Sequence, residues 1–361
     1  MGERMFIEGN VAIGWGAATA GCQAFFGYPI TPQNEITEWF AREFPKMGRI
    51  FVQTQSELGS INMLYGAAAT GIRAMTSTSS PGWSLMQETM SDMANAELPC
   101  VIVDVQRGGP GAGPIRHAQG DYFQCTRGGG HGDYRNIVLV PASTQECCDL
   151  VQLAFYLADK YRNPVLVMSD AIIGRLRETV EVEKIEFGSL PDKEWAVKGK
   201  ANHRDGKRRL VEHGGDLFAR YPSYRALLQS LEQKIKQMQE SELRYEAYKT
   251  EEAELILIAH GYTARVAKEA VNMARAEGIK AGLIRLITAW PFPCQIIREK
   301  AYQGCGFLVV EDCLGQVVED VRSAVEGRTE VHLVSILDRH IPTDGGMILP
   351  DKVFDKIKEI Q

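Results

Sequence analysis

The chain has 361 residues, of which 45% are hydrophobic, and its formal net charge is -6. This length and apolar content suit two or more domains with buried cores. The acidic balance excludes a general attraction to nucleic acid or to an anionic membrane surface.

Met1–Asn10 carries no apolar signal-peptide core, and no apolar run approaches the roughly 18 residues that a membrane span needs. We therefore expect a cytoplasmic protein with no membrane span. The eight cysteines form no C-x-x-C pair, which argues against a structural zinc or iron–sulfur site on this chain. In the cytoplasm we expect them to be reduced thiols that are mostly buried.

Short apolar strands alternate with helical patterns over residues 1–185. Strands are expected at 51–54, 72–76, 100–105, 137–140 and 164–168, and helices at 58–70 and 84–96. This alternation predicts a doubly wound α/β domain, with helices on both faces of a parallel sheet. Four loops follow strand-like runs: "GYPITPQ" (27–33), "TQSE" (54–57), "TSTSSPGWS" (76–84) and "VQRGGPGAGP" (105–114). Because the carboxyl ends of parallel strands share one edge of the sheet, we expect these loops to converge.

Between residues 186 and 250 the chain becomes polar and charged. Residues 198–209 hold six basic side chains and one acidic one, and a polar helix is predicted over 223–249. Charge runs usually face solvent, which favours a solvated linker with a surface helix; a basic arm that contacts a partner or a phosphate group is the alternative. From 251 to 361 a second alternation predicts another doubly wound domain, with strands at 255–259, 280–286, 307–311 and 331–336 and helices at 263–277, 294–303 and 316–325.

Several common catalytic patterns are absent or weak. The chain has no G-x-x-x-x-G-K-[ST] phosphate loop, no G-x-G-x-x-G fingerprint and no G-x-S-x-G elbow. Cys125, His131 and Asp133 lie close in sequence and allow a thiol hydrolase, but loop residues with structural contacts explain them better. A metal site could be drawn from His117, Asp121, His131 and Asp133, but their spacing matches no standard ligand pattern, so no metal site is predicted.

Five short motifs carry a resemblance that covers nearly the whole chain: "YPITP" (28–32), "QTQSELGS" (53–60), "QRGGPGAG" (106–113), "GGHGDY" (129–134) and "EDCLGQ" (311–316). Together they resemble the subunit of 2-oxoacid:ferredoxin oxidoreductases that carries the pyrimidine-binding domain for thiamine diphosphate. The third and fourth motifs look most like the branched-chain (2-oxoisovalerate) branch. The resemblance implies a transketolase-like pyrimidine-binding domain over 1–185, a basic linker and polar helix over 186–250, and a transketolase-C-like domain over 251–361.

The resemblance assigns four residues to the cofactor. Glu57 matches the glutamate that bonds N1′ of the aminopyrimidine and assists proton transfer on the cofactor. Tyr28, Pro29 and Ile30 would pack on the cofactor. Without the family, Glu57 is an ordinary acid at a helix N-terminus, where the helix dipole stabilises it by about 0.3–1 kcal/mol.

The substrate is assigned to residues of two loops. By the resemblance, Arg107 matches the family arginine that receives the substrate carboxylate. A guanidinium suits that role, since it offers a planar fork that fits a carboxylate. Gly108 and Gly109 let the chain pass close to the ligand. Thr31, held between two prolines that end the strand, matches the catalytic threonine near the reacting carbonyl. A surface salt bridge for Arg107 and a structural turn for Thr31 are the alternatives.

The implied activity is oxidative decarboxylation of a 2-oxoacid to acyl-CoA and carbon dioxide with thiamine diphosphate, with electrons passing through iron–sulfur clusters to ferredoxin. The chain has no G-D-G diphosphate motif and no cluster cysteines. The expected partners are therefore a diphosphate-binding subunit that also holds Mg2+, an iron–sulfur (ferredoxin-like) subunit and a gamma-type subunit. Coenzyme A is the expected co-substrate.

A branched, apolar substrate is expected, with 2-oxoisovalerate favoured, because Gly111-Ala112-Gly113 stands where many relatives carry a Ser-Thr pair. 2-Oxoglutarate and pyruvate remain open. Two other classes of function are a nicotinamide-dependent dehydrogenase and a non-catalytic assembly or regulatory subunit. The missing glycine fingerprint disfavours the first, and the retained Glu57 and Arg107 disfavour the second.

Overall fold

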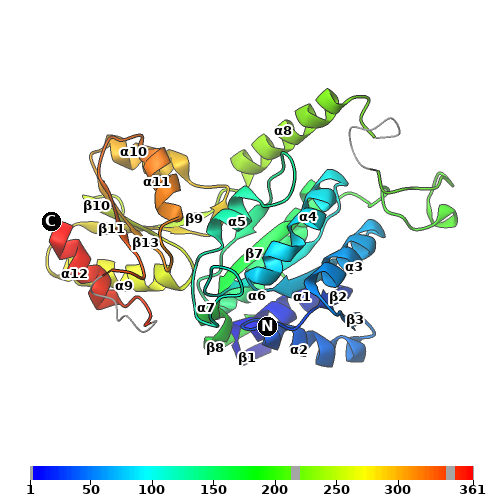
Figure 1. Cartoon of the computed structure of the whole chain (residues 1–361), viewed down its shortest axis with the longest axis horizontal. Helices are drawn as coiled ribbons and strands as arrows, with labels where there is room; N and C mark the ends of the chain where they lie inside the picture. Colours follow the sequence, from blue (N-terminus) through cyan, green and yellow to red (C-terminus); the bar gives the residue numbers. More distant parts are fainter. Residues whose placement is uncertain (1–2, 213–219, 339–345, 361) are drawn as a thin grey trace.

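The computed structural model describes residues 3–212, 220–338 and 346–360. Two largely parallel sheets, each with helices on both faces, form two lobes that lie side by side (Figure 1). The fold class that the alternation predicts, α/β with two doubly wound units, is thereby confirmed.

The first sheet has seven strands within the described residues, and all but its edge strand β12 run parallel. Its order is β12 (Thr288–Trp290), β6 (Ile137–Leu139), β7 (Val165–Asp170), β5 (Val101–Gln106), β4 (Ala74–Thr78), β2 (Ala24–Gly27) and β3 (Ile50–Gln53). Every residue of β4, β5 and β7 is buried, as expected of central parallel strands covered on both faces.

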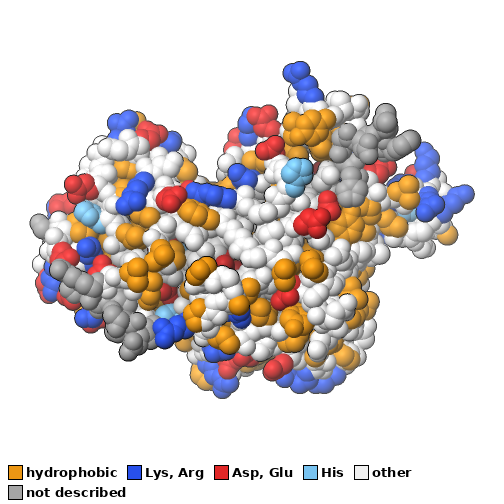
Figure 2. Space-filling model, in the orientation of Figure 1, with side chains coloured by type: hydrophobic (Ala, Val, Ile, Leu, Met, Phe, Trp, Pro, Cys, Tyr) orange, Lys and Arg blue, Asp and Glu red, His pale blue; other side chains and the backbone are white. Residues whose placement is uncertain are grey.

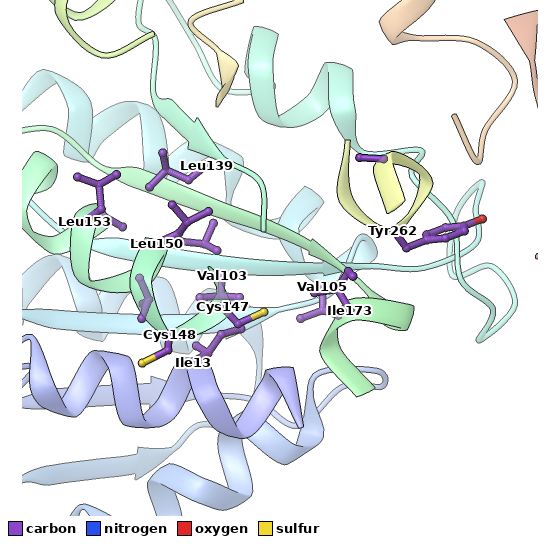
Figure 3. Packing of buried hydrophobic residues seen from close by; sticks show 14 of the residues in the cluster. Ile13, Val103, Val105, Leu139, Cys147, Cys148, Leu150, Leu153, Ile173 and Tyr262 are labelled. Carbon is purple, nitrogen blue, oxygen red and sulfur yellow. The ribbon is translucent and has the colours of Figure 1, made fainter. Parts of the chain in front are cut away.

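Two layers of helices pack on this sheet. One layer holds α1 (Gly9–Thr19), α2 (Asn34–Glu43) and α6 (Thr144–Tyr161), and the other holds α3 (Glu57–Ala69), α4 (Pro81–Asn95) and α5 (Tyr122–Arg127). Successive side chains of a strand point to opposite faces of the sheet. Val103 therefore belongs to the core under α1 and α6, whereas Ile102 belongs to the core under α3 and α4. Figure 3 shows the first core, where Ile13 of α1 and Cys147 of α6 lie against Val103.

The second sheet repeats this plan with five strands in the described part of the chain. Its order is β14 (Val331–Val334), β13 (Gly306–Val310), β10 (Leu255–Ala259), β11 (Ala281–Leu286) and the antiparallel edge strand β9 (Tyr245–Tyr248). The helices α9 (Gly261–Ala276) and α12 (Pro350–Ile360) share one core, and α10 (Cys294–Tyr302) and α11 (Val317–Val325) share the other.

Short elements complete the fold. An antiparallel pair joins β1 (Glu3–Glu8) to β8 (Arg177–Val182), and the remaining elements are η1 (Pro45–Met47), α7 (Ala171–Arg175) and η2 (Lys200–Asn202).

The predicted helix over 223–249 is wrong in its last part. α8 (Tyr224–Ser241) begins after Ser223, whose Oγ accepts a hydrogen bond from Ala226 N at 3.2 Å, and residues Tyr245–Tyr248 form β9 instead of more helix. β12 is also unexpected, because a segment from the later part of the chain pairs with β6 of the first sheet. Both strands pair with segments far from them in sequence, and local composition does not encode such partners.

All eight cysteines are free thiols and seven are buried, as predicted; Cys294 is exposed. Residues 198–209 form the η2 turn and irregular backbone, in which Arg209 pairs with Asp205 at 3.0 Å. None of the described helices is long and apolar enough to cross a membrane.

Candidate active site

The loops after β2, β3, β4 and β5 meet at the carboxyl edge of the first sheet, as the strand placement predicts. After β3, Glu57 lies against Gly82 of the β4–α4 turn. Two residues earlier in that turn, Ser80 accepts a hydrogen bond from Arg107 N at 2.9 Å, and Arg107 Nη1 donates to the carbonyl of Thr31 at 2.9 Å. A continuous path of contacts therefore joins the three residues to which the resemblance assigns catalytic roles.

The "GYPITPQ" loop is fixed by a fully buried glutamine. Gln33 Nε2 donates to Tyr28 O at 3.1 Å, and Gln33 Oε1 accepts from Ser77 Oγ at 2.6 Å and from Thr37 Oγ1 at 3.0 Å. Thr31 itself is half-buried, and its Oγ1 accepts from Asn34 Nδ2 at 3.2 Å. Of the residues expected to pack on the cofactor, Tyr28 and Ile30 are half-buried and Pro29 is exposed.

Glu57 is the first residue of α3, whose N-terminus is capped by Ser56 Oγ, which accepts from Gly59 N at 3.2 Å. The glutamate is buried, with 6% of the residue exposed. A Cβ on Gly82 would lie 2.6 Å from Glu57 Oε1 and 2.1 Å from Thr78 Oγ1, so only glycine leaves room for the carboxylate.

Glu57 differs from the other buried acids. Eight acidic residues are buried in the described part of the chain, and Glu57 alone among them makes no hydrogen bond or ion pair with protein groups. The other seven are Glu97, Asp104, Asp121, Asp170, Glu242, Glu311 and Asp312. Close by, the buried hydroxyls of Thr78 and Ser79 also have no partner. Buried polar groups are costly to leave unpaired, so this pocket is built for hydrogen bonds from outside the chain.

Arg107 is half-buried and its guanidinium is oriented by backbone carbonyls. Besides the bond to Thr31 O, its Nη2 donates to Ala112 O at 2.5 Å, while its Nε is buried and has no partner. Gly108 and Gly113 pass so closely that a Cβ on Gly113 would lie 1.8 Å from Gly108 O. Gly109 is exposed and open, with no atom within 4 Å of its Cβ position.

Beneath Arg107 lies a pair of acids that the sequence motifs do not predict. Ser80 N donates to Asp104 Oδ1 at 2.9 Å, and Ser80 Oγ donates to Asp121 Oδ2. The two acids also hydrogen-bond each other; burial, then the nearby charge of Asp121, raises the pKa of Asp104 well above its usual range. Burial raises the pKa of Asp121 too, although Ser80 and Arg107 work against that rise. One signal was visible: Asp104 interrupts an otherwise apolar strand, "VIVDV".

The second lobe holds the loop that follows Arg107. Gln119 N donates to Asp312 O at 2.8 Å, and Gln119 Oε1 accepts from Asp312 N at 3.1 Å. Gln316 Nε2 donates to Gly120 O at 2.6 Å. The stretch "EDCLGQ" therefore supports the site from behind, because Asp312 and Gln316 fix the two residues that precede Asp121.

The weaker constellations do not assemble. Cys125 is buried and its Sγ lies 3.9 Å from Asp104 Oδ2, whereas His131 and Asp133 are exposed. His117 pairs instead with Asp312, with 2.6 Å between Nδ1 and Oδ2. Over residues 3–212, 220–338 and 346–360, no group of three His, Cys, Asp or Glu side chains could hold a metal ion.

Four exposed apolar side chains lie on the elements that carry the site. Leu58 and Met63 on α3, Leu85 on α4 and Ile115 in the loop after β5 are each at least 43% exposed. Figure 2 shows hydrophobic side chains on the face that carries α3 and α4.

Family models match both lobes. Residues 15–253 match the model described as pyruvate flavodoxin/ferredoxin oxidoreductase, thiamine diP-binding, and residues 253–352 match pyruvate:ferredoxin oxidoreductase core domain II. The chain is 47% identical to the ketoisovalerate oxidoreductase subunit VorB of Methanothermobacter thermautotrophicus, over 98% of this chain and 97% of the relative. It is 40% identical to the 2-oxoglutarate synthase subunit KorA of Methanothermobacter marburgensis, over 99% of both chains.

Two solved structures are similar to the whole chain. A 2-oxoglutarate:ferredoxin oxidoreductase from Magnetococcus marinus, with 2-oxoglutarate, coenzyme A and succinyl-CoA bound, matches with a TM-score of 0.87 at 28% identity, over 100% of this chain and 66% of that chain. A split-gene transketolase, an inactive beta4 tetramer, matches with a TM-score of 0.59 at 14% identity, over 97% and 96%, which shows a shared fold alone.

Fold and family models together define an oxidoreductase subunit with a thiamine-diphosphate-binding domain. The chain belongs to the pyruvate flavodoxin/ferredoxin oxidoreductase family, so the resemblance inferred from its loop motifs is confirmed.

The residues at the sheet edge fit the cofactor that the family model names. An aminopyrimidine presents ring nitrogens and an amino group, and around Gly82 the edge offers the Glu57 carboxylate, which has no protein partner, and the unpaired hydroxyl of Thr78. Gly82 keeps the space next to these groups open.

Proposed function

We propose that this chain supplies the pyrimidine half of a thiamine diphosphate site in a 2-oxoacid:ferredoxin oxidoreductase whose favoured substrate is 2-oxoisovalerate. The buried Glu57 carboxylate, which alone among the described buried acids has no protein partner, carries this proposal. A fold that satisfies its other buried acids and leaves this one unpaired is suited to a ligand that brings a donor to it.

Glu57 would hold N1′ of the aminopyrimidine and keep a proton at that atom. Thiamine diphosphate, when bound, supplies the electron sink for decarboxylation, and this chain supplies orientation and proton control. A positioned acid–base group of this kind contributes about 10²–10⁴ in rate. Packing against Gly82 limits the positions that the carboxylate can take, which supports such a role.

Arg107 would receive the substrate carboxylate. Its unpaired Nε–H and the second hydrogen of Nη2 form a planar fork, which matches the two oxygens of a carboxylate. Thr31 Oγ1 already accepts a hydrogen bond from Asn34, so its own proton is available for the carbonyl or carboxylate oxygen of the substrate. Gly108 and Gly109 would allow close approach beside the arginine.

A branched, apolar substrate is favoured by two observations. Gly111-Ala112-Gly113 offers no polar side chain beside Arg107, and Gly113 cannot carry one while the loop keeps this shape. The chain is also 47% identical to a ketoisovalerate oxidoreductase subunit, against 40% to a 2-oxoglutarate synthase subunit.

Partner subunits would complete the enzyme. We assign the diphosphate and Mg2+ to a diphosphate-binding subunit, because the chain has no G-D-G motif and its described residues offer no cluster of metal ligands. The exposed Leu58, Met63, Leu85 and Ile115 beside the site are suited to cover by that subunit. An iron–sulfur subunit, a gamma-type subunit and ferredoxin would carry electrons onward, and coenzyme A would accept the acyl group, all in the cytoplasm.

The test is turnover of the assembled complex, measured as 2-oxoacid- and coenzyme-A-dependent reduction of a viologen dye. Glu57→Gln is expected to lower kcat by about 10²–10⁴ with little change in the unfolding temperature. Glu38→Gln is the matched control, because Glu38 lies exposed on α2 and makes no ion pair with the described residues. Wild-type turnover of Glu57→Gln would refute the catalytic role and leave the non-catalytic assembly subunit.

The substrate is tested separately with 2-oxoisovalerate, 2-oxoglutarate and pyruvate. We expect the highest kcat/KM with 2-oxoisovalerate. A higher value with either of the others would overturn the substrate assignment and leave the cofactor assignment intact.

A further inference from the structure

Beneath the arginine loop lies a buried network of Ser80, Asp104 and Asp121 that the proposed chemistry does not use. We infer that Asp121, acting through Ser80 and held by Asp104, is a positioning residue that orients Arg107 toward the carboxylate of a 2-oxoacid. The inference rests on the proposed function of Arg107 and adds a specificity role for three residues that touch neither substrate nor cofactor.

Asp104 anchors the network in the sheet. It is fully buried in the centre of β5, and its Oδ1 accepts from Ser80 N at 2.9 Å. A hydrogen bond between two carboxyl groups needs a proton, and the more deeply buried Asp104 is the group that carries it. Burial raises the pKa of Asp104 more strongly than that of Asp121, which favours the proton on Asp104 and the negative charge on Asp121.

Ser80 connects this charge to the arginine loop. Its Oγ donates to Asp121 Oδ2 and accepts from Arg107 N at 2.9 Å. The same Oγ also lies 3.4 Å from Arg107 O, so the hydroxyl contacts both backbone polar groups of Arg107. The acid at the other end is fixed because Asp121 N donates to Gln106 Oε1 at 3.1 Å.

The lack of a direct ion pair between Asp121 and Arg107 in the described part of the chain supports a positioning role. The negative charge of Asp121 acts on Arg107, yet the two side chains form no ion pair within 4.0 Å among the described contacts. A direct bidentate pair would occupy the fork that a substrate carboxylate needs. With one hydroxyl in between, the acid attracts the arginine loop while the Nε of Arg107 stays unpaired.

Asp121 is itself held by the second lobe. The two residues before it are bonded by Asp312 and Gln316, with Gln119 N to Asp312 O at 2.8 Å and Gln316 Nε2 to Gly120 O at 2.6 Å. Contacts from both lobes therefore fix the position of Asp121, as expected of a residue whose role is to position another.

The test separates KM from kcat in the assembled complex. Ser80→Ala and Asp104→Ala are each expected to raise KM for the 2-oxoacid about tenfold, because a hydrogen bond that orients a charged group is lost. We expect kcat and KM for coenzyme A to stay within about twofold. Asp104→Asn, which keeps both a donor and an acceptor, is expected to restore most of the lost affinity relative to Asp104→Ala. Thr76→Val is the control, since this buried hydroxyl on β4, the strand that pairs with β5, has no partner.

The outcomes distinguish the two proposals. If Glu57→Gln loses turnover while Ser80→Ala and Asp104→Ala keep KM within twofold of wild type, only the positioning role is overturned. The positioning role is also overturned if Asp104→Asn and Asp104→Ala show the same fall in kcat and the same rise in KM for the 2-oxoacid, because packing alone would then explain the effect of Asp104. Should the alanine variants fail to assemble, Asp121→Asn keeps the shape and removes the charge: a tenfold rise in KM supports the role, and an unchanged KM refutes it.

Discussion

Gly82→Ala is expected to lose activity although alanine is the better helix former. Gly82 lies in the first turn of α4, where the change would otherwise stabilise the chain by about 0.5–1 kcal/mol. The new Cβ would lie 2.1 Å from Thr78 Oγ1 and 2.6 Å from Glu57 Oε1, whereas ordinary contact begins at 3.4 Å, so both side chains must move, each by about 1 Å. Misplacement of a catalytic group by about that distance costs about 10²-fold in rate.

Viologen reduction by the assembled complex measures this loss. We expect kcat to fall about 100-fold, with KM for the 2-oxoacid nearly unchanged. Gly66→Ala is the matched control, because Gly66 lies in α3 and its added Cβ would meet no atom of the chain within 4 Å. That variant should keep wild-type activity and unfold at a slightly higher temperature. Wild-type kcat in Gly82→Ala would refute the placement of the acid–base step at Glu57.

Three further changes test other parts of the fold. Arg107→Lys keeps the charge but loses the planar fork, so KM for the 2-oxoacid should rise at least tenfold; an unchanged KM would count against carboxylate binding there. Gln33→Leu leaves the polar groups around the "GYPITPQ" loop unpaired and should lower the free energy of unfolding by about 2–4 kcal/mol, measured with urea; a loss below about 0.5 kcal/mol would contradict the bracing role. Burial lowers the pKa of His260 to about 4, so the unfolded chain takes up this proton first, and stability is full above about pH 6.5 and falls as the pH drops toward 4. Between pH 7 and pH 5 the loss should be about 2 kcal/mol smaller in His260→Gln than in wild type, and equal losses would refute this.

The placement of the candidate site follows from the sequence because parallel strands share a direction. Each motif that carries Thr31, Glu57 or Arg107 stands directly after an apolar run, so the rule for parallel sheets sends all three to one edge. Their identity as a set came from the resemblance, since each residue alone has an ordinary structural explanation. The structure adds the contacts that connect them, above all the bond from Arg107 to Thr31 O.

The acid network could not be predicted in the same way. Asp104 sits in a strand and Asp121 in a loop 17 residues later, and the pair forms only because the second lobe holds that loop over the sheet. The sequence marks Asp104 as a buried acid in need of a partner but does not say which partner. The same limit applies to β9 and β12, whose pairing depends on how the lobes pack and not on local propensity.

At the carboxyl edge of the first sheet, the polar groups that support the site have hydrogen-bond partners within the chain, and the groups proposed to bind ligands do not. The backbone of Arg107, the carboxylate of Asp121 and both side-chain oxygens of Asp104 all have partners within the chain. By contrast, the carboxylate of Glu57 and Nε of Arg107 have none among the described residues. A buried group such as Nε of Arg107 lowers the stability of the isolated chain while it is unpaired, and a ligand that pairs with it restores that stability. The loops at this edge are therefore better described as one half of a binding site than as structural turns. Their supporting groups are fixed by hydrogen bonds, and their binding groups are left unpaired.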